Sequence, residues 1–169
     1  MKVVALNGSH NKAGNTFQAL QIVAAELEKE QIETEIITVG DKVIKGCTGC
    51  HTCKTTGSCV LSDPKFSEML AKIYAADGLL LGSPVYYAGI NGTFKSFLDR
   101  AFFSSTAGQM RFKVGASIVV LRRAGAMSAF SELNTFLLAS EMLVVPAGFN
   151  VVFGARPGEI RQDREGLWR

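Results

Sequence analysis

The sequence predicts an α/β fold in which a doubly wound parallel sheet of five strands carries helices on both faces. Two observations support this. Short apolar runs alternate with longer helical patterns along the whole chain. No repeat, low-complexity tract or linker interrupts that order, and 169 residues match the size of one domain. We therefore expect a single domain over residues 1–169.

The first half of the chain supplies two strands and two helices. Residues 3–6 are an apolar run that ends at a small polar loop, which is typical of a strand buried on both faces. Apolar side chains recur at helical spacing over residues 16–30, which predicts a helix. Residues 32–39 alternate charged and apolar side chains and favour a strand near the sheet edge. A second helix is expected after Asp63-Pro64, because proline suits a first helical turn.

The second half continues the alternation. Residues 78–82 form a third apolar run, and a helix is expected over 93–103 with Lys95, Asp99 and Arg100 facing solvent or pairing locally. The remaining predicted elements are a strand at 115–121, a helix at 127–143, and a fifth strand at either 144–145 or 149–153.

The helix that usually closes a doubly wound fold is apparently missing or truncated. After the loop at 154–159 only residues 163–169 remain, which is too short for a helix that is stable by itself. We expect either that the chain is cut short relative to its gene product or that a partner subunit covers the last strand.

Composition narrows the possible functions. A net charge of +3 with scattered basic residues does not predict a nucleic-acid partner. No segment approaches the roughly 18 apolar residues of a membrane span, and no signal-peptide pattern is present. We therefore expect a cytoplasmic protein with no membrane partner.

The loop after the first strand has the character of a phosphate cradle. Its small residues let the backbone curl around an anion, and the helix that follows offers its positive end. It lacks both the Gly-Lys-Ser/Thr ending of a nucleoside-triphosphate loop and the G-x-G-x-x-G spacing for a dinucleotide. The alternative is an ordinary turn in which Asn15 or Thr16 caps the helix. The residues expected to bind the phosphate are Ser9, Asn11, Gly14, Asn15 and Thr16.

A second loop carries a family resemblance. Residues 83–93, running into 94–100, resemble the signature of the NAD(P)H-dependent FMN reductases and related flavodoxin-like flavoproteins, and the Gly14-Asn15-Thr16 segment is placed as in that family. The resemblance implies a flavodoxin-like fold, bound FMN and NAD(P)H as a possible co-substrate. It implies a flavin ring flanked by the second loop at Pro84, Val85, Tyr86 and Tyr87 and by a third loop at Arg123, Ala124 and Gly125.

Both assignments have plainer alternatives. Tyr86 and Tyr87 are also compatible with loop packing or a subunit interface. Arg123 is equally compatible with a solvated strand end, although a cation near the flavin would stabilise the negative charge of the reduced ring.

All four cysteines of the chain fall within a cysteine-rich loop at 46–62, at Cys47, Cys50, Cys53 and Cys59. Their C-x2-C-x2-C-x5-C spacing resembles the run that wraps an iron–sulfur cubane, and their place after the second strand resembles the iron–sulfur flavoproteins. That resemblance implies a [4Fe-4S] cluster. Three alternatives stay open: zinc, with His51 as a further ligand, redox-active thiols, and free thiols.

These features together predict an FMN-dependent oxidoreductase that moves electrons between NAD(P)H or ferredoxin and an acceptor, through flavin and a [4Fe-4S] cluster. No side chain is expected to act as a catalytic acid or base, since the chemistry takes place at flavin N5. One alternative is a cluster-free NAD(P)H-dependent FMN or quinone reductase, and another is a cysteine-based redox sensor or zinc-binding module. The expected partners are ferredoxin or a small-molecule acceptor, in a homodimer or homotetramer.

Overall fold

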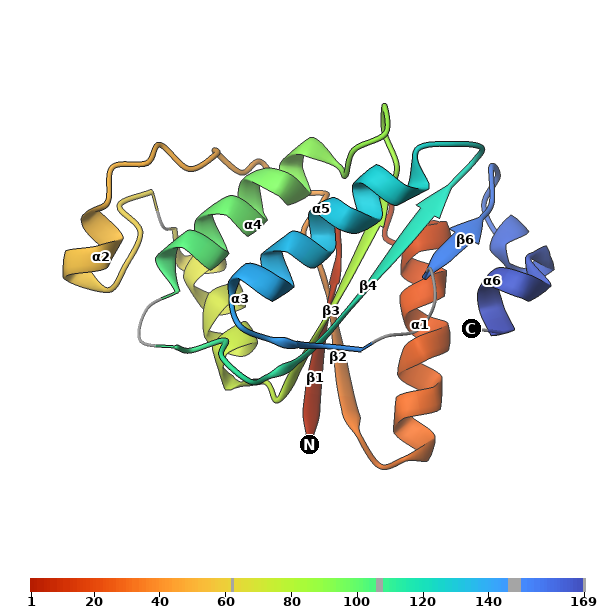
Figure 1. The fold of residues 1–169 in the computed structure, drawn as a ribbon, viewed down its shortest axis with the longest axis horizontal. Helices are drawn as coiled ribbons and strands as arrows, with labels where there is room; N and C mark the ends of the chain where they lie inside the picture. Colours follow the sequence, from red (N-terminus) through yellow and green to blue (C-terminus); the bar gives the residue numbers. More distant parts are fainter. Residues whose placement is uncertain (62, 106–107, 146–149, 169) are drawn as a thin grey trace.

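A computed structural model of the protein describes all residues except 62, 106–107, 146–149 and 169. Its strands form one sheet in the order β2-β1-β3-β4-β5, with β6 also paired to β4, and every pairing is parallel. The predicted doubly wound parallel sheet is therefore confirmed (Figure 1). The strands are β1 (Lys2–Asn7), β2 (Glu33–Thr38), β3 (Gly78–Pro84), β4 (Val114–Leu121), β5 (Leu143–Val144) and β6 (Val151–Phe153).

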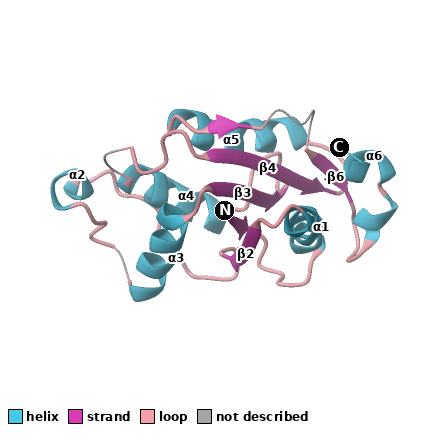
Figure 2. Cartoon of the chain, turned by 90° about the horizontal axis from the view of Figure 1, so that it is seen from below, coloured by secondary structure: helices cyan, strands magenta, loops and turns pink. Residues whose placement is uncertain are grey.

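Helices cover both faces of the sheet, as Figures 1 and 2 show. One face carries α3, α4 and α5, and the other carries α1 with the short C-terminal helices. In the part of the chain that the structure describes, no helix has the length and apolar character needed to cross a membrane. The helices are α1 (Asn15–Lys29), α2 (Thr52–Thr56), α3 (Pro64–Ala75), α4 (Gly92–Ser104), α5 (Ala126–Ala139), the 3-10 helix η1 (Glu159–Gln162) and α6 (Arg164–Trp168).

The central strands are buried on both faces, which explains why their sequences are continuously apolar. In β1, Val4 and Leu6 point into the core under α3, α4 and α5, whereas Ala5 points into the core under α1. Residues of β3 alternate in the same way, with Leu80 facing α1. The two strands pair with each other at the centre of the sheet, and the pleat sends their alternate side chains to opposite cores.

The fifth strand position is filled by both segments that the sequence offered. Leu143 of β5 pairs with Val114 at the start of β4, and Val151 of β6 pairs with Val119 near its end. Residues 146–149, including the predicted strand start at Phe149, lie outside the described part of the chain. Helix α5 is shorter than predicted: it ends at Ala139, and the backbone turns at Glu141, where φ is 56°.

The predicted C-terminal stub is a short helix after all. Both carboxylate oxygens of Asp163 accept hydrogen bonds, from the Phe153 N–H (2.7 Å) and the Gly166 N–H (3.0 Å), and Leu167 packs against the core under α1. These tertiary contacts stabilise a helix of five residues that would be unstable alone. Beside it, the α1 face of the sheet retains an apolar groove of about 210 Å³.

Candidate functional site

The loops after β1 and β3 that were predicted to bind the cofactor border a cavity of about 250 Å³. The chain leaves β1 toward α1 on one face and leaves β3 toward α4 on the other, so the crevice opens where the winding reverses. Open parallel sheets bind ligands at this point, beyond the carboxyl ends of their strands. The cavity is lined by Ser9, His10, Asn11, Gly14, Asn15, Thr16, Pro84, Val85, Tyr86, Val120, Leu121, Arg122, Gly154, Ala155 and Pro157.

The start of α1 fits an anion. Gly14 is the N-cap and makes no side-chain cap, and the first turn of the helix contains no acidic residue. The helix therefore presents uncapped N–H groups and an unopposed positive dipole end to the cavity. A Cβ atom at Gly14 would lie 3.1 Å from the side chain of Asn11. Glycine at this position therefore leaves a narrow path by which an anion can reach the N–H groups of the first turn. The turn itself is held by Ser9 Oγ, which accepts from the Asn11 N–H (3.1 Å).

Asn15 has a structural task that the sequence did not reveal. Its Nδ2 donates to the carbonyls of Gly154 (3.1 Å) and Arg156 (2.8 Å), and its Oδ1 accepts from the Gly158 N–H (2.7 Å). The alternative in which Asn15 or Thr16 caps α1 is wrong, because Gly14 occupies the cap position. These bonds hold the loop at 154–158 against the start of α1, so that this loop forms one wall of the cavity. The sequence signal that could have revealed this wall is the position of the loop directly after a strand, at the same edge of the sheet.

The loop after β3 forms the opposite wall. Pro84, Val85 and Tyr86 line the cavity, whereas Tyr87 does not and is fully exposed. Tyr86 and Gly89 exchange two backbone hydrogen bonds of 2.9 and 3.0 Å, which closes a tight turn. The two residues between them, Tyr87 and Ala88, have positive φ values of 48° and 62°. Non-glycine residues adopt this conformation only where surrounding contacts impose it.

Contacts from α4 and α5 impose that turn. The side chain of Asn91 accepts a hydrogen bond from the Phe94 N–H (3.1 Å) and so caps α4. The backbone N–H of Asn91 donates to Ser83 Oγ (3.1 Å). Glu132 of α5 accepts from the N–H of Ile90 (3.1 Å). Glu132 could not be identified from the sequence, since only the tertiary structure brings α5 beside this loop.

The third loop approaches the cavity differently from the prediction. Arg122 lines the cavity, while Arg123 is exposed and is not among the lining residues. Gly125 caps α5 with φ of 88°, and a Cβ there would lie 2.7 Å from the Cα of Ala88. The second and third loops therefore touch through glycine. Cofactor contact by Arg123, Ala124 and Gly125 stays a prediction.

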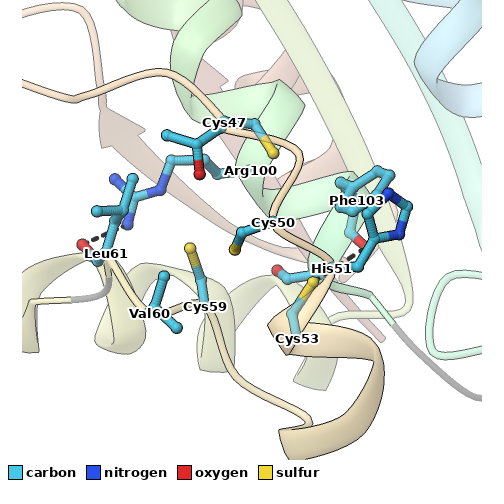
Figure 3. A pocket seen from close by; sticks show the side chains of 11 residues that line it. Cys47, Cys50, His51, Cys53, Cys59, Val60, Leu61, Arg100 and Phe103 are labelled. Atoms are coloured by element: carbon cyan, nitrogen blue, oxygen red, sulfur yellow. Dashed lines mark hydrogen bonds between the residues drawn. The ribbon is translucent and has the colours of Figure 1, made fainter.

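The cysteine loop builds a second pocket at a different place. Cys47, Cys50, Cys53 and Cys59 all line it, together with His51 and Arg100 (Figure 3). Cys53 is buried and its Sγ lies 3.9 Å from the carbonyl of Phe103, whereas Cys47 and Cys50 are exposed. Among the described residues, no three His, Cys, Asp or Glu side chains are arranged to hold a metal ion. The thiols share one pocket without converging on a point as tetrahedral zinc ligands would.

One cysteine has a lowered pKa. Hydrogen bonds from the Thr52 hydroxyl, and then from its backbone N–H and the Thr48 hydroxyl, lower the pKa of Cys50 from its usual value. The thiolate is the form that binds metals. The hydrogen bonds around Cys50 therefore shift its equilibrium toward the protonation state that a ligand to iron or zinc needs.

Arg100 lies inside this pocket rather than in solvent, which corrects the prediction from the helical pattern. Its side chain is 3% exposed and stacks on Phe66, with the guanidinium carbon 4.0 Å from the ring centroid. Its Nε is buried and has no hydrogen-bond partner among the described residues. The predicted local pair on α4 is Lys95 with Asp99, at 2.8 Å. A buried cation lining a pocket of four thiols fits an anionic group, such as an iron–sulfur cluster held by thiolates.

Helix α4 separates the two sites. Asn91 at its N-cap ends the loop whose residues Pro84 to Tyr86 line the cavity, while Arg100 and Phe103 near the other end of the helix line the cysteine pocket. Gly92 and Phe103 lie roughly 17 Å apart along the axis, at 1.5 Å per residue. Figure 1 shows α2 and the cysteine loop beyond the far end of α4. The loading of each site can therefore be measured separately.

Known proteins resemble the chain in both sequence and fold. The family model for NADPH-dependent FMN reductases matches residues 1–155. An iron–sulfur flavoprotein of Methanocaldococcus jannaschii is 34% identical, over 99% of this chain and 90% of its own length. The structure of RosB with bound 8-demethyl-8-formylriboflavin-5′-phosphate aligns with a TM-score of 0.76 at 19% identity, over 97% of this chain and 71% of that chain. A flavodoxin from the domain Archaea aligns at 0.64 with 13% identity, over 99% of this chain and 94% of that chain. The chain belongs to the NADPH-dependent FMN reductase family and is a flavin-dependent oxidoreductase with a flavodoxin-like fold.

Proposed function

We propose that this protein binds FMN in the cavity at the strand ends and a [4Fe-4S] cluster in the cysteine pocket, and passes electrons between a reductant and an acceptor. The observation that carries the proposal is the presence, in one chain, of an uncapped helix N-terminus facing a cavity and a four-cysteine pocket with a buried cation. The relative from Methanocaldococcus jannaschii, named an iron–sulfur flavoprotein, supports the same pairing.

The residues of the cavity bind and orient the flavin. The first-turn N–H groups of α1 and the loop at Ser9 and Asn11 hold the terminal phosphate. The walls formed by Pro84 to Tyr86 and by Leu121 and Arg122 flank the ring. Bound FMN supplies the redox chemistry, so no side chain has to act as acid or base. The exposed Tyr86-Tyr87 turn is where NAD(P)H would approach.

Cys47, Cys50, Cys53 and Cys59 hold the cluster, which supplies one-electron transfer when bound. Two of these thiols are exposed, so the cluster lies near the surface, where a partner such as ferredoxin can approach. Ferredoxin or a small molecule is the proposed partner. We further propose that the protein works in the cytoplasm as a homodimer or homotetramer. Light scattering that finds only monomers would refute the proposed homodimer or homotetramer.

Anaerobic purification followed by assays of flavin, iron and acid-labile sulfide per chain tests the proposal. We expect about one FMN with about four iron and four sulfide per chain. Rapid bleaching of the flavin by NADPH or NADH would identify the nicotinamide as donor, whereas bleaching only by reduced ferredoxin would identify the protein partner. Absence of flavin would refute the function itself.

A cluster-free NAD(P)H-dependent reductase is the second candidate. It is favoured by the arrangement of the thiols, which do not converge on one metal position among the described residues. Full flavin with neither iron nor sulfide after anaerobic reconstitution would decide for it. Zinc in place of iron would instead identify the cysteine loop as a zinc-binding module.

A further inference from the structure

The cysteine loop is closed at its base by a single side chain. Arg100 Nη2 donates to the carbonyl of Leu61 (2.7 Å), and Nη1 lies 3.4 Å from the carbonyl of Lys45. These two carbonyls stand on either side of the four cysteines, which occupy positions 47 to 59. The fork of the guanidinium thus ties the entry and the exit of the loop to α4. Figure 3 shows the bond at the exit, between Arg100 and Leu61.

The position of Arg100 is fixed by its surroundings. It stands one helical turn after Phe97 on the buried face of α4, and it stacks on Phe66 of α3. The planar guanidinium is suited to this combination of stacking and paired donation, whereas a lysine could supply only a point charge. Phe66 and Phe97 are themselves in edge contact, with ring centroids 5.3 Å apart. The clamp is therefore anchored in the main core.

The charge of Arg100 has no carboxylate partner among the described residues. Its bonds to the described residues go to neutral carbonyls, and its buried Nε has no partner among them. The pocket lining contains no Asp or Glu. Burying an uncompensated cation is unfavourable, so a negative group in the same pocket would stabilise the fold. A cluster bound by four thiolates carries such a charge, and nearby charge is one of the factors that set its reduction potential.

We propose that Arg100 is the positioning residue of the cysteine pocket, which clamps both ends of the loop and holds a buried positive charge that raises the reduction potential of the cluster. This inference rests on the proposed function, because it requires that the cluster is bound. A neutral residue at position 100 removes the charge and the fork together. A lysine keeps the charge and loses the fork.

Anaerobically reconstituted wild type, Arg100→Gln, Arg100→Lys and Arg111→Gln separate these effects. Arg111 is the control, since it is half-exposed and pairs with Glu141 on the surface. The measurements are iron and sulfide per chain, and the midpoint potential of the cluster from a redox titration followed by electron paramagnetic resonance. At the midpoint of the wild type, we expect the ratio of reduced to oxidised cluster to fall about tenfold in Arg100→Gln, which corresponds to about 59 mV for one electron.

Arg100→Lys is expected to stay within about twofold of the wild-type ratio while its iron content falls, and Arg111→Gln should change neither quantity. An unchanged ratio in Arg100→Gln would overturn the electrostatic role. If Arg100→Gln takes up no iron, amide hydrogen exchange of the iron-free proteins decides: residues 46–61 must exchange faster than in Arg111→Gln, and equal exchange would overturn the clamp. Wild type without iron and sulfide would instead refute the cluster itself.

Discussion

Gly125 should be the position where a single methyl group most directly disturbs the cavity wall. It has φ of 88°, and a Cβ would lie 2.7 Å from the Cα and 2.9 Å from the Cβ of Ala88. An alanine there therefore meets two separate penalties. Left-handed backbone costs a residue with a side chain roughly 1–2 kcal/mol, and overpacking costs about 1–3 kcal/mol more.

Gly158 provides a matched control for the backbone penalty. It has the same φ of 88°, but nothing lies within 4 Å of the position that a Cβ would take there. Gly158→Ala should therefore lower the free energy of unfolding by only about 1–2 kcal/mol. Gly125→Ala should lower it by about 2–5 kcal/mol, which is the sum of both penalties. Urea denaturation of the flavin-free proteins at neutral pH measures both values.

Flavin affinity supplies the second readout. Because Ala88 is displaced in Gly125→Ala, the turn that carries Tyr86 must move, and Tyr86 lines the cavity. We expect the dissociation constant for FMN to rise about three- to tenfold, equivalent to about 0.7–1.4 kcal/mol, with less than a twofold change in Gly158→Ala. Equal stability losses in the two variants would refute the contact between the loops, whatever the flavin result.

Single contacts elsewhere in the molecule lead to three more predictions. Asn15→Ala should lower the free energy of unfolding by about 1–3 kcal/mol and speed amide hydrogen exchange at Gly158. Asn15→Asp keeps the oxygen that accepts from the Gly158 N–H, so exchange of that amide should be slower than in Asn15→Ala. Cys50→Ser should lower iron and sulfide per chain and leave flavin content unchanged, because the two sites lie at opposite ends of α4; parallel loss of flavin would contradict this. Hydrogen bonds from Lys72 and then Lys2 lower the pKa of Glu35 from 4.5. Glu35→Gln should therefore lose about 0.5–1 kcal/mol at pH 7, and the difference from wild type should shrink as pH falls below 4.5 through the folded-state pKa, as followed by urea denaturation.

Much of the fold could be predicted because its signals are local. The apolar runs at β1 and β3 are buried on both faces, and α3 begins at Pro64, as the sequence suggested. Periodicity also predicted α4, which was expected over residues 93–103. Periodicity alone was misleading for Arg100, which the helical pattern left for solvent and the structure buries. A long charged side chain can follow the apolar face when tertiary neighbours offer carbonyls and an aromatic ring.

The candidate sites also contain some features that local sequence could predict and others that it could not. The loop before α1 could be identified as part of a site from its small residues, and the cysteine pocket from spacing alone, because each signal lies within one short loop. Phosphate binding by the first of these loops stays a prediction. The contributions of Glu132 and of residues 154–158 could not, since they come from elements far along the chain. The split of the fifth strand into β5 and β6 was also beyond local signals, because either segment could pair with β4.

The sequence by itself determined the alternating α/β order, the place of the small-residue loop before α1 and the grouping of four thiols in one loop. Those properties depend on spacing between near neighbours, where side-chain periodicity and turn chemistry act directly. Only the tertiary structure decided that Asn15 holds the loop at 154–158, that Gly125 touches the turn at Ala88, and that Arg100 closes the cysteine loop. Each of these joins residues that are distant in sequence, and their contact exists only after the helices pack on the sheet.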